Sequence, residues 1–203
     1  MLARQLKHHD DTPVEDKIVV LHGMSWADYQ RLQEARGESS VPRLAYLEGE
    51  LEITTPSRSH ESLKSRIGCL VEVWCLEKGV EFSTYGSWTL EKREAERGLE
   101  PDECYVFGTE QEPERPDLAI EVVWTSGGVR KLDIYRALGV SEVWFWRRGR
   151  ITVHVLHGDH YEEVPQSACL AGIDLTQLVE YLDRPTTSQA IREYRSALSG
   201  DTR

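Results

Sequence analysis

The stretch that decides the fold is residues 115–128, "RPDLAIEVVWTSGG", an apolar run that carries one carboxylate, Glu121. Its β-branched residues predict a strand, and its near-continuous hydrophobicity predicts a central place in a sheet that is covered on both faces. A carboxylate buried in such a strand is costly unless a cation, a metal ion or hydrogen-bond donors compensate it. The compensating partner of Glu121 is therefore the first question that this sequence raises.

The composition bounds the class of protein. The chain has 203 residues, of which 39% are hydrophobic and 29% are charged, as is typical of one soluble domain with a substantial core. No apolar run approaches the ~20 residues that a membrane-spanning helix needs. The first residues, "MLARQLKHHDDTPVEDK", lack the apolar segment of a secretory signal. We therefore expect a cytoplasmic protein that does not enter a membrane.

The charged residues and the cysteines narrow the functional classes. The four cysteines form no CxxC pair, which favours buried reduced thiols over a disulfide framework or a zinc site. The formal net charge of −11 opposes nonspecific attraction to nucleic acid, so a nucleic-acid role would have to use a local basic surface. The one compact basic cluster is Arg147, Arg148 and Arg150, for which a solvated hairpin tip is favoured over a phosphate contact.

The pattern along the chain predicts an α/β (α+β) fold with one mixed sheet flanked by helices. Residues 1–22 are polar and predict a loosely held N-terminal arm, and residues 23–203 predict a single domain. The expected elements, in chain order, are a helix capped by Ser25, a hairpin with its tip at Glu48-Gly49, a helix ending at Gly79, an extended segment over 80–91, a charged loop over 92–100, strands over 101–108 and 116–124, a helix ending at Gly139, strands over 141–165, and C-terminal helices at about 174–198.

Two carboxylates fall on strands that are close in the chain. Asp102 begins the strand "PDECYVFG", and Glu121 lies inside "DLAIEVV". If these strands pair as antiparallel neighbours, both carboxylates reach the same end of the sheet, where paired hard oxygen ligands suit Mg²⁺. Lys131 begins the helix that follows the second strand, so it can pair with Glu121, orient a water molecule or stabilise charge on a phosphate. From the residues alone, a plain Glu121–Lys131 ion pair and a metal site both stay open.

These segments resemble a known family. "PDECYVFG" followed by "PDLAIEVVWTSGGVRKLDIYRALGVSEVWFW" is similar to the Uma-type restriction endonuclease family, a branch of the PD-(D/E)XK nuclease superfamily. The likeness extends upstream through "YLEGELEITTPSRSHESLKSRIGCLVEVWCLEKG" and "YGSWTL", so it covers roughly Trp26 to Leu182. The resemblance implies the αβββαβ core of that superfamily, with the site at one end of the sheet.

The resemblance also implies roles for individual residues. Asp102 matches the aspartate of the PD motif and Glu121 matches the second acid, so both are expected to hold Mg²⁺, with Mn²⁺ as a substitute. The superfamily places a lysine two positions after the second acid, where this chain has Val123; it resembles the branch in which the lysine is on the following helix, here Lys131. A second Pro-Asp pair ends at Asp117, on the same strand as Glu121, and is the alternative to Asp102.

The upstream helix start "SRSHESL" adds Glu61 as a further candidate ligand of metal or water and His60 as a residue lining the cleft. Without the resemblance, both are first-turn residues of a helix, and Tyr135 is a core residue that can support Lys131. The activity implied is metal-dependent hydrolysis of DNA phosphodiester bonds by an endonuclease. The alternative is a nuclease-fold protein without cleavage activity that binds DNA or a protein partner, which the acidic charge and Val123 favour. Separately, the apolar residues of the C-terminal strands favour a homodimer, which is common where two duplex strands must be cut and is compatible with either function.

Overall fold

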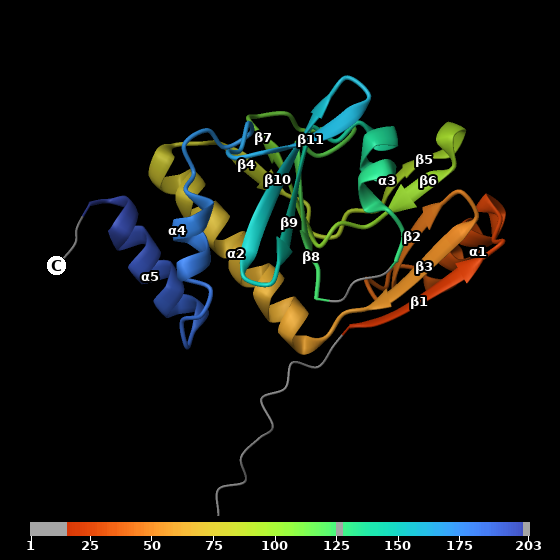
Figure 1. The fold of residues 1–203 in the computed structure, drawn as a ribbon, viewed down its shortest axis with the longest axis horizontal. Coiled ribbons are helices and arrows are strands. Elements are labelled where there is room, and N and C mark those ends of the chain that lie inside the picture. Colours follow the sequence, from red (N-terminus) through yellow and green to blue (C-terminus); the bar gives the residue numbers. More distant parts are fainter. Residues whose placement is uncertain (1–15, 125–127, 201–203) are drawn as a thin grey trace, which may run out of the picture.

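The computed structural model describes residues 16–124 and 128–200. Within these ranges the strands form two sheets, and the helices lie outside and between them (Figure 1). The first sheet has the order β1-β3-β2-β6-β5 and is antiparallel throughout. Its strands are β1 (Lys17–His22), β2 (Arg43–Leu47), β3 (Glu50–Thr55), β5 (Leu90–Lys92) and β6 (Arg97–Leu99).

The second sheet is mixed and has the order β11-β10-β9-β8-β7-β4. Its strands are β4 (Phe82–Thr84), β7 (Glu103–Phe107), β8 (Leu118–Val122), β9 (Glu142–Arg147), β10 (Arg150–His157) and β11 (His160–Val164). Only β8 and β9 pair in parallel among the described strands, because helix α3 (Lys131–Leu138) provides the crossover between them. The central place of β8, predicted from its apolar run, is confirmed, since all five of its residues are buried.

The helices begin and end where the sequence predicts. Ser25 caps α1 (Trp26–Arg36) in a capping box with Asp28, and Ser57 caps α2 (Arg58–Lys78), whose end at Gly79 is left-handed. The 3-10 turn η1 (Arg93–Ala95) and the helices α4 (Leu175–Glu180) and α5 (Thr187–Leu198) complete the described elements. The predicted α/β class and most predicted elements are therefore confirmed.

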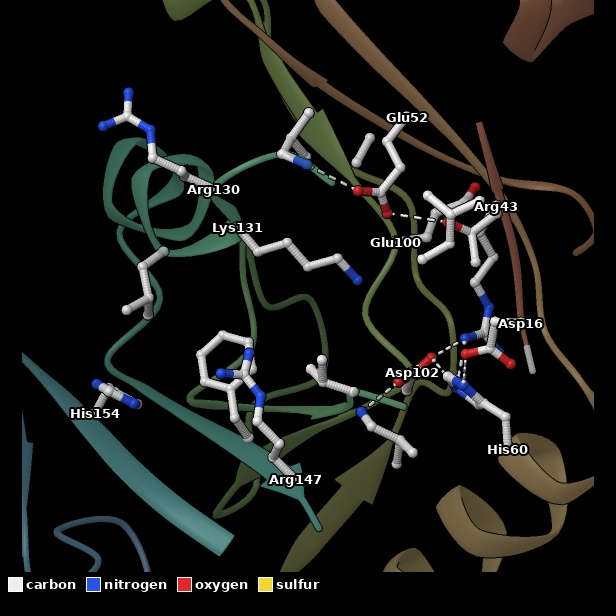
Figure 2. A pocket seen from close by; sticks show the side chains of 18 of the residues that line it. Asp16, Arg43, Glu52, His60, Glu100, Asp102, Arg130, Lys131, Arg147 and His154 are labelled. Atoms are coloured by element: carbon white, nitrogen blue, oxygen red, sulfur yellow. Dashed lines mark hydrogen bonds and ion pairs between the residues drawn. The ribbon is translucent and has the colours of Figure 1, made fainter. Parts of the chain in front are cut away.

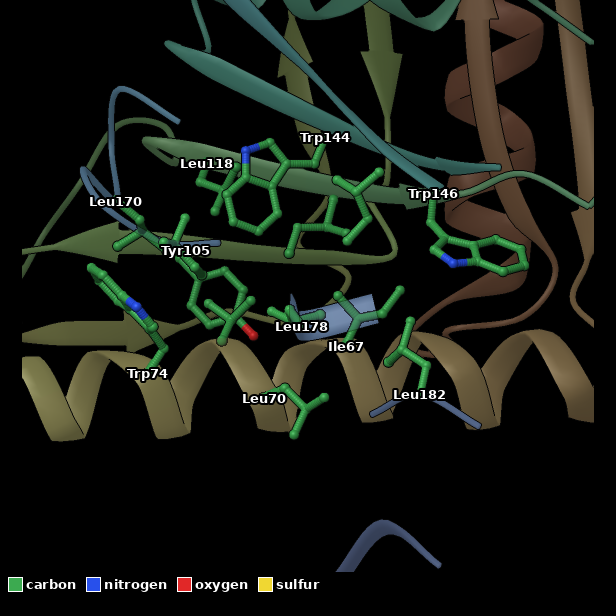
Figure 3. Packing of buried hydrophobic residues seen from close by; sticks show 14 of the residues in the cluster. Ile67, Leu70, Trp74, Tyr105, Leu118, Trp144, Trp146, Leu170, Leu178 and Leu182 are labelled. Carbon is green, nitrogen blue, oxygen red and sulfur yellow. The ribbon is translucent and has the colours of Figure 1, made fainter. Parts of the chain in front are cut away.

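The main core lies between α2 and the mixed sheet. Figure 3 shows Ile67 and Trp74 of α2 facing Leu118 and Trp144 of the sheet. Helices α4 and α5 close the same side of the sheet, while α3 and the first sheet cover its other face (Figure 1). Because β8 is covered on both faces, any polar group on it needs a partner within the protein.

Three predictions about the fold were wrong. The described residues form two sheets instead of one, because the hairpin β2–β3 pairs with β1 and β6, and β6 pairs with β5, in a sheet of its own. Residues 17–22, assigned to a loosely held arm, form β1 and pair with β3, so the ordered domain begins before residue 23; residues 1–15 lie outside the described residues. The charged loop at 92–100 is the turn and second strand of the β5–β6 hairpin, whose exposed edge tolerates charged side chains.

Candidate active site

A pocket of about 810 Å³ opens between the two sheets. The first sheet contributes Arg43 and Glu52 to its wall, and the start of α2 contributes His60. Asp102, at the start of β7, and Lys131, at the start of α3, lie in the same wall (Figure 2). The pocket therefore forms where ends of both sheets and the N-terminal ends of two helices meet.

Asp102 and Glu121 come together through the pairing of β7 and β8. These strands are antiparallel, with Glu103 opposite Ile120, so the register continued by one position brings Asp102 beside Glu121. The Asp102 Oδ2 atom accepts a hydrogen bond of 2.6 Å from the Val122 backbone N–H, which fixes the carboxylate against β8. The predicted antiparallel pairing of the two carboxylate-bearing strands is confirmed.

Glu121 has two side-chain donors. The Lys131 ammonium lies 2.6 Å from Oε2, and the Tyr135 hydroxyl donates to Oε1. Glu121 has no exposed surface, whereas one quarter (25%) of the Lys131 side chain is exposed, so the lysine stands between the carboxylate and the pocket. The predicted contact between Lys131 and Glu121 is present, and Tyr135, which follows Lys131 by one helical turn, supports the same carboxylate.

The charges around Lys131 keep it protonated. Burial lowers the pKa of Lys131, but attraction to the Glu121 and Glu52 carboxylates and the hydrogen bond to Glu121 outweigh burial and raise the pKa above its usual value. Burial and the Glu121 charge raise the pKa of the Tyr135 hydroxyl well above its usual range. Both groups therefore act as proton-bearing donors to Glu121 at neutral pH.

Glu52 positions the start of α3. Its Oε2 atom accepts a hydrogen bond of 2.9 Å from the Val129 backbone N–H, and its Oε1 atom accepts one of 3.0 Å from the Thr54 hydroxyl. Gly128 has φ +101°, and a Cβ atom at this position would collide with Glu52 Oε2. Glycine is therefore required for the carboxylate of the first sheet to reach the helix that carries Lys131.

Asp102 is part of a buried polar chain. Its Oδ1 atom contacts the Arg43 guanidinium and lies 2.9 Å from His60 Nε2, while His60 Nδ1 lies 2.7 Å from Asp16 Oδ2 (Figure 2). Burial raises the pKa of Asp16, but its hydrogen bonds with His60 and the Ser57 backbone outweigh burial and lower the pKa below its usual value. His60 thus joins Asp102 to the start of β1.

The other candidate residues lie at different distances from this centre. The Glu61 carboxylate accepts a hydrogen bond of 2.7 Å from Arg43 and is partly exposed, so it reaches Asp102 through that arginine. Asp117, the alternative aspartate, lies before β8 and accepts a hydrogen bond of 2.8 Å from the Phe107 backbone N–H. Because β7 and β8 are antiparallel, Asp117 is at the end of the strand pair opposite to Asp102, and it does not line the pocket.

Sequence reasoning missed three charged residues of the site: Asp16, Arg43 and Glu52. Arg43 and Glu52 are 8% and 5% exposed, so each is a buried charge in an apolar strand, as Glu121 is. Glu52 alternates with Leu51 and Ile53, and Arg43 stands at the beginning of its strand, so the sequence assigns both charges to solvated positions. Nothing in the sequence around Asp16 distinguishes it from the polar residues before it.

The donor atoms of the site fit a hard divalent cation in their chemistry. Asp102 and Glu121 offer carboxylate oxygens from neighbouring strands, and the Arg43 guanidinium bridges Asp102 and Glu61 as a stand-in for a cation. Among the described residues, no group of three or more His, Cys, Asp and Glu side chains is gathered closely enough to hold a metal. Asp102 and Glu121 would therefore hold such a cation, and water would have to complete its coordination.

The arrangement of sheets and helices is an α/β fold that is shared with a solved structure. A crystal structure from Anabaena variabilis, of a protein described as a putative nuclease belonging to DUF820, superimposes with a TM-score of 0.52 at 13% sequence identity. The match covers 86% of this chain and 99% of the other chain. At this identity the likeness establishes the fold alone.

The chain belongs to the Uma2 family, which is described as "Putative restriction endonuclease" and whose model matches residues 26–185. The family predicted from the sequence is thereby confirmed, and membership supports a nuclease function. No curated protein sequence matches the chain significantly. In the described part of the chain, no helix combines the length and the apolar character needed to cross a membrane.

Proposed function

We propose that this chain is a Mg²⁺-dependent endonuclease that hydrolyses DNA phosphodiester bonds, with Mn²⁺ as a substitute ion. Asp102 and Glu121 would hold the metal, and Lys131 would be the catalytic cation. The observation that supports this best is the 2.6 Å contact of Lys131 with Glu121 at a pocket that Asp102 also lines. Lys131 on the helix takes the place of the strand lysine, because this chain has Val123 at the position where the superfamily has that lysine.

The residues of the chain can each perform one part of the reaction. The protonated, partly exposed Lys131 faces the pocket, so it can orient the attacking water or stabilise negative charge on the phosphate. Tyr135 holds the second oxygen of Glu121 in place, and the Val122 N–H holds Asp102. A bound Mg²⁺ would supply charge neutralisation on the phosphate and a water of lowered pKa.

The test is cleavage of supercoiled plasmid with Mg²⁺, with EDTA, and by the variant Glu121→Gln. We expect Mg²⁺-dependent nicking that falls at least ~100-fold in Glu121→Gln, the scale seen when one preorganised electrostatic group leaves an active site. Asp133→Asn is the matched control, because it removes a carboxylate from the same pocket without contacting Glu121 or Asp102. Cleavage that survives Glu121→Gln, or that EDTA leaves unchanged, would refute the proposal.

A second function is a nuclease-fold protein that binds DNA or a protein partner without cleaving. It is favoured by the donors that already occupy both carboxylates: Arg43 and His60 on Asp102, and Lys131 and Tyr135 on Glu121. Calorimetric titration with Mg²⁺ and with Mn²⁺ separates the two functions. Binding that Asp102→Asn abolishes supports the endonuclease, whereas absence of binding by either ion supports the non-cleaving protein.

The endonuclease proposal includes a homodimer, since two active sites would cut the two strands of a duplex. Light scattering at micromolar concentration tests this part separately. A mass of twice 23.3 kDa is expected, and a mass of 23.3 kDa would contradict it.

Cleavage of a single-stranded RNA of the same sequence as the DNA, at an equal rate, would contradict the choice of DNA as substrate.

A further inference from the structure

The β9–β10 hairpin places three arginines on the rim of the pocket. Arg147 ends β9, Arg148 forms the turn with Gly149, and Arg150 begins β10. All three arginines line the pocket, together with Phe145 of the same hairpin. Figure 2 shows the Arg147 side chain rising from β9 into the pocket, on the side where Lys131 enters from α3.

The register of the hairpin sets like charges against each other. Arg147 and Arg150 are directly opposite in the antiparallel pair, so their side chains leave the same face of the sheet. Like charges in directly opposite positions destabilise a strand pair. The repulsion between Arg147 and Arg150 therefore destabilises the hairpin, and an anionic ligand bound between them would remove this repulsion.

The described residues do little to neutralise this charge. Neither the Arg147 nor the Arg148 side chain has a hydrogen-bond or ion-pair partner in the part of the chain that the structure describes. Arg150 has one carboxylate, Glu163 at 3.5 Å, and both side chains are largely exposed (76% and 54%). By contrast, Arg130 on the opposite rim pairs with Asp133 at 3.1 Å. The hairpin is therefore a local positive surface on a chain with a net charge of −11.

We propose that Arg147, Arg148 and Arg150 bind backbone phosphates of the DNA strand that enters the pocket, next to the bond held at Asp102 and Lys131. This inference rests on the proposed function and adds the element that holds the substrate. Guanidinium groups bind phosphate oxygens through two parallel hydrogen bonds, so a pair of facing arginines suits one phosphate or two successive ones. This proposal differs from the prediction made from the sequence, which favoured a solvated hairpin tip over a phosphate contact.

The experiment is fluorescence anisotropy of a dye-labelled DNA duplex in EDTA, with affinity measured over a series of salt concentrations. Each phosphate contact contributes roughly 0.9 to the slope of log affinity against log salt, so Arg147→Gln/Arg150→Gln should lower the slope by about 1 if the two arginines share a phosphate and by about 2 if they bind two. The control Arg31→Gln/Arg93→Gln removes the same charge outside the pocket, from α1 and η1, and should leave the slope unchanged. Equal losses in both variants, or no loss in the hairpin variant, would overturn the proposal.

Two further readouts separate phosphate binding from a loss of folding and from an acidic protein partner. The variant Arg147→Lys/Arg150→Lys keeps the charges and should retain the slope, and thermal unfolding should show the glutamine variant at least as stable as wild type, because a like-charge contact is lost. Polyglutamate that displaces DNA at equal charge concentration would show an acidic surface partner and overturn phosphate recognition. The binding assay contains EDTA, so it does not depend on cleavage. Slope changes as expected, with no cleavage under Mg²⁺, would refute the proposed function but support this inference. Mg²⁺-dependent cleavage that the hairpin variant leaves unchanged would refute this inference but support the proposed function.

Discussion

Replacing Lys131 by methionine tests whether this lysine is the compensating partner of Glu121. Methionine keeps the length and apolar stem of the side chain but leaves the fully buried carboxylate with Tyr135 as its remaining side-chain donor. Breaking a buried ion pair by removing one partner costs roughly 3–5 kcal/mol. Lys131 is one quarter (25%) exposed and Tyr135 stays in place, so we expect a smaller loss, of about 2–3 kcal/mol.

The assay is urea unfolding at neutral pH, followed by the fluorescence of the six tryptophans. The double variant Lys131→Met/Glu121→Gln should recover at least ~1 kcal/mol of the loss, because an amide in place of Glu121 carries no unpaired charge. A single variant within about 0.5 kcal/mol of wild type, the range of ordinary surface changes, would refute the reasoning. A double variant no more stable than the single one would refute it as well.

Two predictions concern the residues that support this centre. Asp16→Asn should destabilise the protein at neutral pH. Because the pKa of Asp16 is lowered in the folded state, its contribution to stability is present above the usual pKa of 3.8 and is lost as pH falls through the folded pKa. The difference in unfolding free energy between variant and wild type, measured by urea unfolding, should therefore narrow in acid. A gap that stays constant into acid would contradict the Asp16–His60 contact. Gly128→Ala should lower stability by roughly 1–3 kcal/mol through positive φ and collision with Glu52. The control Gly158→Ala, with φ +62° and open space around it, should cost less in thermal unfolding, and an equal cost would argue against the Glu52 contact.

The centre of the site could be predicted because it depends on neighbours along the chain. A carboxylate in a buried strand requires a partner, and the helix that follows β8 offers Lys131 at its first residue. The ten residues between β7 and β8 are too few for the crossover that a parallel pair needs, so the strands pair antiparallel and Asp102 reaches the same end as Glu121. These inferences use the period of the strands and the cost of burial, so they did not need the rest of the fold.

The other half of the site could not be predicted in the same way. Arg43 and Glu52 reach Asp102 and α3 only because the first sheet packs over the end of the second, and no local pattern fixes that packing. Asp16 reaches His60 because β1 adds to β3 at the edge of that sheet. The proposed role of the β9–β10 arginines depends on the fold in a similar way, because only the folded structure shows that they line the pocket.

The most direct measurement compares the two aspartates that follow a proline, Asp102 and Asp117. Each is replaced by asparagine, and Mg²⁺-dependent plasmid cleavage is measured per folded molecule. Asp102 lines the same pocket as Lys131, and Asp117 lies at the opposite end of the strand pair, where its carboxylate accepts a hydrogen bond from a backbone N–H. We predict that Asp102→Asn loses cleavage at least ~100-fold and that Asp117→Asn keeps it. Cleavage that survives Asp102→Asn but is lost in Asp117→Asn would contradict the assignment of the active site.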